Sequence, residues 1–326
     1  MPQYIARRIL QFIPVFLGVT LLLFFLTRVI PGDPIAMLSG QRVQSPVVLA
    51  QMRHAFGLDL PLWKQYLKYL ADILHGDFGT SISTGRPVGE IFAEKYPYTV
   101  KLALAAITVE IIVGISAGII SAIKQYSFWD VTVTLSTSLL VSLPVFWLGM
   151  LLQMFFGIWL KNMTDGQFYL PMSGAGGATS AFPEWVYLIL PAITLASVST
   201  AYAARIQRSQ LLEVNGSDYI RTAHAKGLSD RAVLIRHSMK NALIPVVTFI
   251  ALDLGAMMSG AILTETVFNW PGIGYTIYSA INKRDWPVVI GSTLIVTFVF
   301  LVINLVVDIS YAFLDPRIRY GGAEGK

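Results

Sequence analysis

The chain has 326 residues, of which 55% are hydrophobic and only 13% are charged, and its mean hydropathy is +0.62. Soluble domains carry roughly 25% charged residues, so this composition excludes an ordinary soluble protein and indicates a membrane protein. The net charge of +5 does not lie on one long polar face, so nucleic-acid binding is not expected, and the absence of cysteine excludes disulfides, thiolate metal sites and a cysteine nucleophile.

Six apolar segments are long enough to cross a bilayer core, which takes about 20 residues per helix. This pattern predicts an all-α membrane protein with six transmembrane helices. Pro144 and Pro191 interrupt the third and fourth segments and predict kinks. Arg7 and Arg8 precede the first segment as in a signal peptide, but its apolar run is too long and no small-residue cleavage site follows, so we expect a retained anchor. The segments cover residues 9–29, 100–123, 131–160, 185–204, 242–264 and 287–314.

The distribution of lysine and arginine predicts the orientation of these helices. Seven basic residues lie between positions 205 and 240, and cytoplasmic loops carry such an excess. We therefore expect both termini to lie in the cytoplasm. The chain then divides into the first helix with its N-terminal segment (1–30), a long external loop (31–97) and a five-helix region (98–326) that contains a cytoplasmic loop at 205–241.

The external loop is expected to contain two helical stretches, around 47–56 and 62–74. In the second stretch an apolar stripe recurs at helical spacing. The simpler interpretation is that the stripe packs on the chain's own outer surface; a docking role is the alternative, because loops of this length usually have a function. The stripe consists of Trp63, Tyr66, Leu67 and Leu70.

The cytoplasmic loop contains the polar stretch "SDYIRTAHAKGLSDR" at 217–231. Ser217 is a good N-cap for a short helix over 219–226, Gly227 stands where a C′ glycine would end it, and Ser229 can start a second helix. So short a helix is marginal alone in water. It either lies in a partner's groove or belongs to an ordinary solvated loop. Its small apolar face would consist of Tyr219, Ile220 and Ala223.

Ionisable residues inside the predicted helices are candidate sites, because a carboxylate facing lipid is costly. Glu110 lies near the middle of the second helix, Asp253 near the middle of the fifth, and Asp308 toward the inner end of the sixth. They either line a translocation pathway or form hydrogen bonds between helices. Met257 and Met258 follow Asp253 and are taken with it and Glu110 as pathway candidates.

Catalytic motifs are not found in the sequence. The four histidines form no H-E-x-x-H pair, no G-x-S-x-G elbow is present, and no metal site is expected. There is also no G-x-x-x-x-G-K-[ST] phosphate loop, so any ATP that drives this protein must be bound by another chain. We therefore expect neither an enzyme nor a cofactor in this chain.

Several stretches together resemble the permease subunits of ATP-binding-cassette (ABC) importers, and in particular the B-type permeases of dipeptide and oligopeptide importers. In that family the cytoplasmic loop carries E-A-A, three residues and then glycine; here Arg221 and Thr222 replace the glutamate and the first alanine, and Pro245 lies further from Gly227 than in the general pattern. These departures resemble the peptide branch. The stretches are "YIRTAHAKGLSDRAVLIRHSMKNALIP" (219–245), "RVIPGDP" (28–34), "FGLDLPLWKQYLKYL" (56–70), "GDFGTS" (76–81), "ETVFNWPGIG" (265–274), "RDWPVV" (284–289) and "LDPRIR" (314–319).

The resemblance implies a permease in the inner (cytoplasmic) membrane of a prokaryote, surrounded by lipid and forming half of a peptide pathway. Its implied partners are a second permease subunit, usually a paralogue, two ATP-binding subunits that hold ATP and magnesium, and an external substrate-binding protein. A peptide's amino terminus would suit Asp253 or Glu110. The short helix would couple to an ATPase through Tyr219, Ile220, Arg221, Thr222, Ala223, His224, Ala225, Lys226 and Gly227.

A secondary transporter or channel driven by an ion gradient, without ATPase partners, is the alternative. Glu110 and Asp253 could serve such a carrier. Carriers of this kind often contain inverted repeats, and the sequence contains no convincing repeat. The long cytoplasmic insert also has no obvious use in a lone carrier. The sequence itself leaves the substrate open among dipeptides, longer peptides, glutathione, nickel chelates and short sugars.

Overall fold

The computed structural model describes residues 2–29, 59–177 and 179–314. The described part is helical, and its only bridge between extended residues is an isolated one, between Thr80 and Pro87. Sequence stretches 30–34, 47–56 and 315–319, and the side chain of Asp308, lie outside the described residues. Within these described ranges, five helical stretches are long and apolar enough to cross a membrane: Val88–Ile123, Val145–Met163, Glu184–Asn215, Asp230–Met258 and Trp286–Val307.

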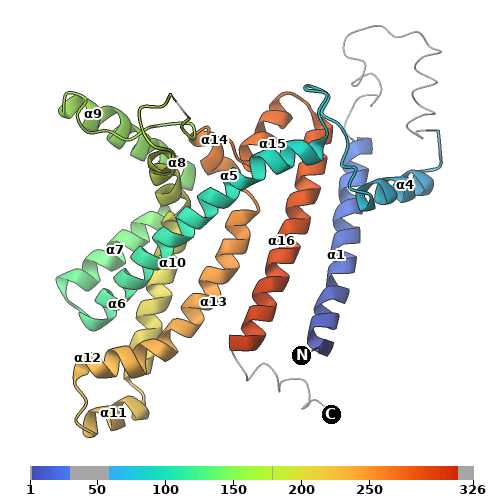
Figure 1. The fold of residues 1–326 in the computed structure, drawn as a ribbon. Coiled ribbons are helices and arrows are strands. Elements are labelled where there is room, and N and C mark those ends of the chain that lie inside the picture. Colours follow the sequence, from blue (N-terminus) through green and yellow to red (C-terminus); the bar gives the residue numbers. More distant parts are fainter. Residues whose placement is uncertain (1, 30–58, 178, 315–326) are drawn as a thin grey trace. The chain divides into compact units, whose positions relative to one another are not determined.

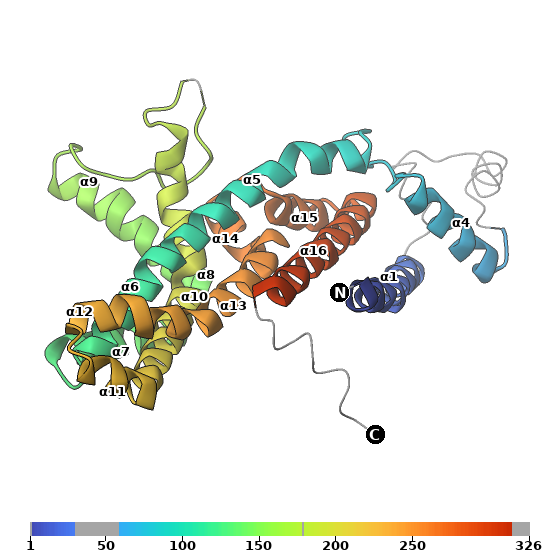
Figure 2. The same cartoon turned by 60° about the horizontal axis from the view of Figure 1, so that its bottom comes forward.

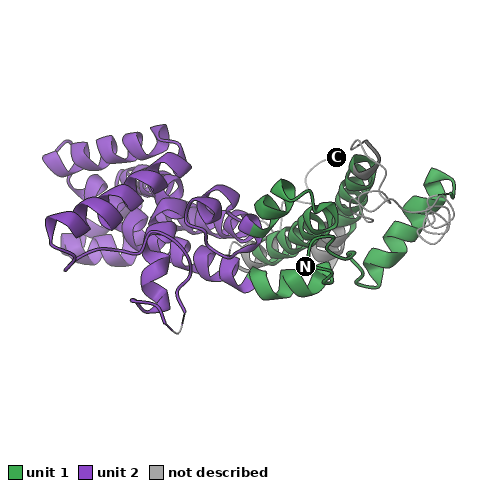
Figure 3. Cartoon of the chain, turned by 90° about the horizontal axis from the view of Figure 1, so that it is seen from above, with its two compact units in different colours: residues 1–96, 276–326 green, residues 97–275 purple. Residues whose placement is uncertain are grey.

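The chain forms two compact units, coloured separately in Figure 3. Unit 1 comprises residues 1–96 and 276–326, and unit 2 comprises residues 97–275. The first and last helices belong to the same unit. Helix α1 (Pro2–Val29), which contains the shorter apolar stretch Leu10–Leu26, packs against α16 (Trp286–Leu314).

Within unit 1, a buried carboxylate joins two segments that are far apart in sequence. Asp285, in the turn before α16, accepts hydrogen bonds from the hydroxyls of Ser81 and Ser83 (2.6 Å each) and from the backbone N–H of Ile82 (3.1 Å). Burial disfavours its charge, but these donors outweigh that effect and hold the pKa of Asp285 below its ordinary value. The stretches "GDFGTS" and "RDWPVV" are thus one structural feature.

Unit 2 is built around α10 (Glu184–Asn215), which packs against α6 (Ile115–Ile123), α7 (Phe128–Ser142), α8 (Val145–Leu152) and α13 (Met239–Met258) (Figures 1 and 2). The approach of α6 to α10 depends on a glycine. A Cβ at Gly118 would lie 2.6 Å from the carbonyl oxygen of Ala204, which no side chain can tolerate. Small residues allow such close helix packing in membranes.

Several predicted helix bounds differ from the structure. The segment predicted at 131–160 is two helical stretches, because Leu143 takes an extended conformation (ψ 134°) before Pro144, and a residue before proline disfavours helix. Pro191, by contrast, lies inside α10 without ending it. Helix α5 (Val88–Val109) begins inside the predicted external loop, α10 runs eleven residues past the predicted 204 to Asn215, and α13 ends at Met258 rather than 264.

Three π-helical turns interrupt these long helices. They are Glu110–Gly114 between α5 and α6, Gln153–Trp159 between α8 and α9 (Leu160–Met163), and Leu234–Ser238 between α12 (Asp230–Val233) and α13. Single π turns inside α-helices are frequently found at functional sites. The first of them begins at Glu110, which the sequence analysis selected as a candidate.

Candidate functional site

The polar stretch after α10 forms the short helix α11 (Asp218–Ala225), close to the predicted 219–226. Ser217 stands at the N-cap with extended backbone (φ −77°, ψ 153°), as predicted. Its hydroxyl does not cap α11, however, but donates to the carbonyl of Val214 at the end of α10 (2.5 Å). The serine therefore ties α11 to the end of α10.

The C-terminal end of α11 confirms the predicted role of Gly227. This glycine has φ +79°, in the left-handed region. Its N–H donates to the carbonyl of His224 (2.9 Å), and the N–H of Leu228 donates to that of Ala223 (3.4 Å). This pair of bonds is the Schellman motif, which ends a helix with a residue in the left-handed conformation.

The apolar face of α11 packs against its own loop. Ile220 and Ala223 are 3% and 5% exposed and contact Val233 of α12, with Val214 and Leu228 at the edge of the cluster. Ile220 and Ala223 are therefore covered by residues of their own chain, and their part in coupling stays a prediction. The physical reason is that an eight-residue helix gains its stability from packing, and the following segment supplies that packing.

The opposite face of α11 is exposed and basic. Arg221 forms only a long contact with the exposed Asp218 (3.4 Å), and the ring of His224 lies 3.5 Å from the fully exposed Asp230. Tyr219 is partly exposed and accepts a hydrogen bond from Asn241. Surface pairs of this kind contribute little to stability, so the face is open to a partner. The exposed residues of α11 and its C-cap are Asp218, Tyr219, Arg221, Thr222, His224, Ala225 and Lys226.

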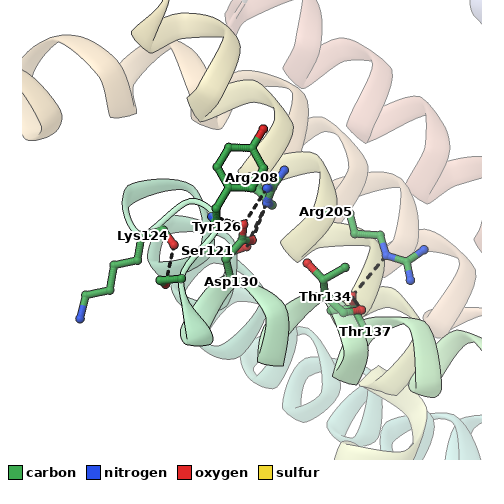
Figure 4. Close-up of polar contacts among 9 residues, drawn as sticks. Ser121, Lys124, Tyr126, Asp130, Thr134, Thr137, Arg205 and Arg208 are labelled. Atoms are coloured by element: carbon green, nitrogen blue, oxygen red, sulfur yellow. Dashed lines mark hydrogen bonds and ion pairs between the residues drawn. The ribbon is translucent and has the colours of Figure 1, made fainter.

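A partly buried ion pair holds the C-terminal half of α10, and the sequence analysis did not identify it. Arg208 of α10 binds Asp130 of α7 with two hydrogen bonds, 2.8 and 2.9 Å long (Figure 4). The carboxylate, 4% exposed, also accepts hydrogen bonds from the hydroxyl of Ser121 and the N–H of Tyr126. Hydrogen bonds from Arg208, then Ser121 and Tyr126, hold the pKa of Asp130 well below its usual range. The two partners are 78 residues apart, so no local pattern predicts the pair.

Glu110 and Asp253 lie beside each other in unit 2. Glu110 is fully buried, and neither of its carboxylate oxygens has a hydrogen-bond partner among the residues that the structure describes. Asp253 is partly exposed, with one oxygen likewise unpartnered. The structure therefore brings the two predicted carboxylates together. Among the described residues, no group of three or more His, Cys, Asp or Glu could hold a metal ion.

The two methionines of the predicted pathway lie one turn further along α13. Met257 is 5% exposed and packs in the hydrophobic core of unit 2 with Ala106 and Ile250. Met258 is half-buried against the same cluster. In this conformation both side chains fill space between helices, and Asp253 and Met258 are the partly exposed members of the four pathway candidates.

A second buried carboxylate was also missed by the sequence analysis. Glu265, in α14 (Ile262–Val267), is fully buried and accepts hydrogen bonds from the Thr99 hydroxyl and the Tyr275 N–H, both 2.8 Å long. Burial raises the pKa of Glu265, although these bonds oppose the shift. Gly272 and Gly274, at the start of α15 (Ile273–Asn282), leave the space that the carboxylate occupies. The only sequence signal was a glutamate followed by closely spaced glycines.

The chain is similar to known proteins over nearly its whole length. Residues 114–320 match the family described as "Binding-protein-dependent transport system inner membrane component", and residues 1–103 match its N-terminal component. The chain is 40% identical over 337 residues to the "Dipeptide transport system permease protein DppB" of Escherichia coli (strain K12), covering 98% of this chain and 99% of that protein. It is 41% identical over 334 residues to the "Di/tripeptide transport system permease protein DppB" of Pseudomonas aeruginosa (strain UCBPP-PA14), with the same coverage.

Both matches span nearly the whole chain, so they apply to both compact units. The resemblance that the sequence motifs suggested is confirmed, and the lone carrier driven by an ion gradient is not favoured. The chain belongs to the family of inner membrane components of binding-protein-dependent transport systems, the permease subunits of ABC importers, and is a multi-pass protein of the bacterial inner membrane.

Proposed function

We propose that the chain forms half of the pathway of an ATP-driven importer of short peptides. The names of its relatives, which are dipeptide and di/tripeptide permeases, support this substrate class. A second permease subunit would complete the pathway, two ATP-binding subunits would hold ATP and magnesium, and an external binding protein would deliver the peptide. Both termini and the loop after α10 would face the cytoplasm.

One observation supports the coupling role most strongly. Helix α11 is held by packing beneath it, by the Schellman motif at its end and by Ser217 at its start, yet its basic face is exposed. A marginal helix that is fixed so firmly, and open on one side only, suits docking into a groove of a separate chain. The ATPase would contact the exposed residues, while Ile220 and Ala223 would transmit the motion to α10 and α12.

The proposal is tested by isolating the protein in mild detergent from its native membrane and identifying every co-purifying chain by mass spectrometry. Two ATP-binding chains and a second permease are the expected companions. The complex should take up dipeptides in liposomes only when ATP is present on the side of the ATPases. A lone chain that transports without ATP would contradict the proposal and favour the ion-gradient carrier.

Gly227→Val is expected to reduce uptake strongly, whereas Gly227→Asn should retain most of it. A left-handed residue with a side chain costs about 1–2 kcal/mol, and a β-branched side chain makes the conformation a true outlier, while asparagine tolerates it. A Cβ at position 227 meets no atom within 4 Å, so the effect comes from the backbone alone. Peptide uptake by cells that express equal amounts of each variant is the measurement. Equal uptake by the two variants would argue against a role for the helix end.

Asp253→Asn is expected to weaken uptake of peptides with a free amino terminus without disturbing ATPase binding. The partly exposed carboxylate would attract the peptide's ammonium group, while the neighbouring Glu110 is too deeply buried to be reached by a peptide. Removing one of two like charges should not impair folding. The KM for a dipeptide should rise relative to that of Leu252→Met, a volume-conserving change at an exposed position of the same helix. An unchanged KM and rate would make Asp253 a structural residue.

A further inference from the structure

We propose that α4 (Leu62–Leu74) lies flat on the membrane, in the leaflet where α1 ends and α16 begins, with one edge immersed among the lipid acyl chains. In unit 1 this helix crosses α1 rather than running along it (Figure 1). Its residues divide into three sectors around the helix axis. Each sector has a different chemical character, and each fits one of three surroundings: protein, lipid and water.

The first sector packs on protein. The hydroxyl of Tyr66 donates to the carbonyl of Leu17 (3.2 Å) and lies 3.0 Å from the hydroxyl of Thr20, both on α1. Ile73 is 8% exposed and clusters with Leu23 of α1 and Leu294 of α16. The rings of Tyr66 and Tyr69 also contact that of Phe24. This sector holds α4 against α1 and α16.

The second sector is apolar and exposed. Trp63, Leu67 and Leu74 are 62%, 55% and 78% exposed, with Leu70 half-buried among them. At 3.6 residues per turn, this edge lies roughly 100° around the helix from Tyr66, Tyr69 and Ile73. If α4 lies beside α1 and α16 with this edge facing the centre of the bilayer, its four apolar side chains lie among the lipid acyl chains. Of the predicted stripe, Tyr66 thus contacts protein, whereas Trp63 and Leu67 remain uncovered and Leu70 is half-buried between them.

The third sector is polar and lies roughly another 120° around the axis. It contains Lys64, Lys68 and Asp72. The ammonium group of Lys64 lies 5.3 Å from the centre of the Trp63 ring, between the polar and apolar edges. Lysine can extend its head to water over an apolar stem, and tryptophan favours the membrane–water interface. Going around the helix axis, the three sectors suit protein, lipid and water in turn, as expected for a helix at the membrane interface.

The depth of α4 agrees with this placement. At the C-terminal end of α4, Ile73 clusters with Leu294, and Ile290 packs against the same cluster; Ile290 and Leu294 lie about 6 and 12 Å below the start of α16 at 1.5 Å per residue. Interfacial helices bury their apolar face about 5–10 Å into the boundary of headgroups and acyl chains. Helix α1, on which α4 packs, also exposes apolar side chains: Leu17, Leu21 and Leu22 are 42%, 42% and 59% exposed. Lipid therefore fits this edge better than a second protein does.

The chain contains no cysteine, so single-cysteine variants can be spin-labelled without removing native residues. The full chain, with its co-purifying partners, is placed in nanodiscs, and each label is tested for collisions with oxygen, which concentrates in lipid, and with a water-soluble nickel chelate. Trp63→Cys, Leu67→Cys and Leu74→Cys should favour oxygen, as should the α1 reference Leu21→Cys. The matched neighbours Lys64→Cys and Lys68→Cys should favour the nickel chelate.

Each other outcome overturns the proposal. Ready collision with the nickel chelate at positions 63, 67 and 74 would place α4 in water, away from the membrane. Immobile labels at those positions, shielded from both reagents, would mean that a protein covers the edge. Either result would leave the peptide importer assignment intact, because that assignment does not depend on α4.

Discussion

Replacing Gly272 by alanine should destabilise unit 2 by about 2–4 kcal/mol, the combined scale of overpacking and of a disturbed buried polar group. The added Cβ would lie 2.5 Å from the carboxylate of Glu265. That carboxylate has little freedom to move, because Thr99 and Tyr275 bind it and Gly274 closes the other side. Thermal unfolding in detergent measures the effect, and the yield of inserted protein should fall as well.

A double-mutant cycle identifies the cause of this destabilisation. Glu265→Ala alone should also destabilise the protein, because it leaves the buried Thr99 hydroxyl and Tyr275 N–H without an acceptor. In that background Gly272→Ala should have little further effect, since the group it would strike has been removed. Gly89→Ala is a suitable control, because its Cβ would meet its nearest neighbour at an ordinary 3.9 Å. Additive losses in the cycle would mean that Gly272 serves a different purpose.

Arg208→Lys is expected to reduce peptide uptake by roughly tenfold, the scale of one lost charge-assisted hydrogen bond. Arginine binds both oxygens of Asp130 in a planar fork, which lysine cannot reproduce. The C-terminal half of α10 would then be held less firmly to α7. Helix α11, which follows α10 in the chain, would be positioned less accurately. Uptake per ATP hydrolysed is the informative quantity, because looser positioning should waste ATP.

Arg205→Lys is the matched control for this prediction. Arg205 lies one turn earlier on α10 and contacts the hydroxyl of Thr137 (Figure 4). It also contacts the hydroxyl of Ser138, and neither hydroxyl is charged. Lysine can satisfy a neutral hydroxyl, so this variant should transport nearly normally. Asp130→Asn should resemble Arg208→Lys, because it keeps the shape of the side chain but removes the charge. Equal losses from both arginine variants would indicate a general effect of basic residues on this helix.

Local patterns in the sequence predicted the helical architecture and the end of the coupling helix. The left-handed Gly227 is the clearest case, because only a few residue types suit that conformation and the capping pattern is short. The break at Pro144 likewise follows from the chemistry of one residue, although a kink rather than a break was expected. These features depend on neighbours within a few positions of the chain.

Features that depend on distant partners could not be predicted. Arg208 appeared to be one of seven basic residues of a loop, whereas it lies on a helix and binds Asp130. The apolar spacing of Ile220 and Ala223 correctly indicated a buried face, but spacing does not reveal whether the covering surface comes from the same chain or another. Here Val233, only ten residues beyond Ala223, covers it.

The length of α10 determines how far its membrane-embedded part would move when its cytoplasmic end is displaced in the proposed importer. Its 32 residues extend for about 48 Å, while the hydrocarbon layer is about 30 Å thick, so roughly 18 Å of rigid helix projects beyond the layer. A tilt of about 10° pivoting at one end would swing the other by about 8 Å. Displacement along a tilting rigid helix decreases toward its pivot. A large movement of α11 during the ATPase cycle would therefore produce only a small displacement of the part of α10 that lies deep in the bilayer.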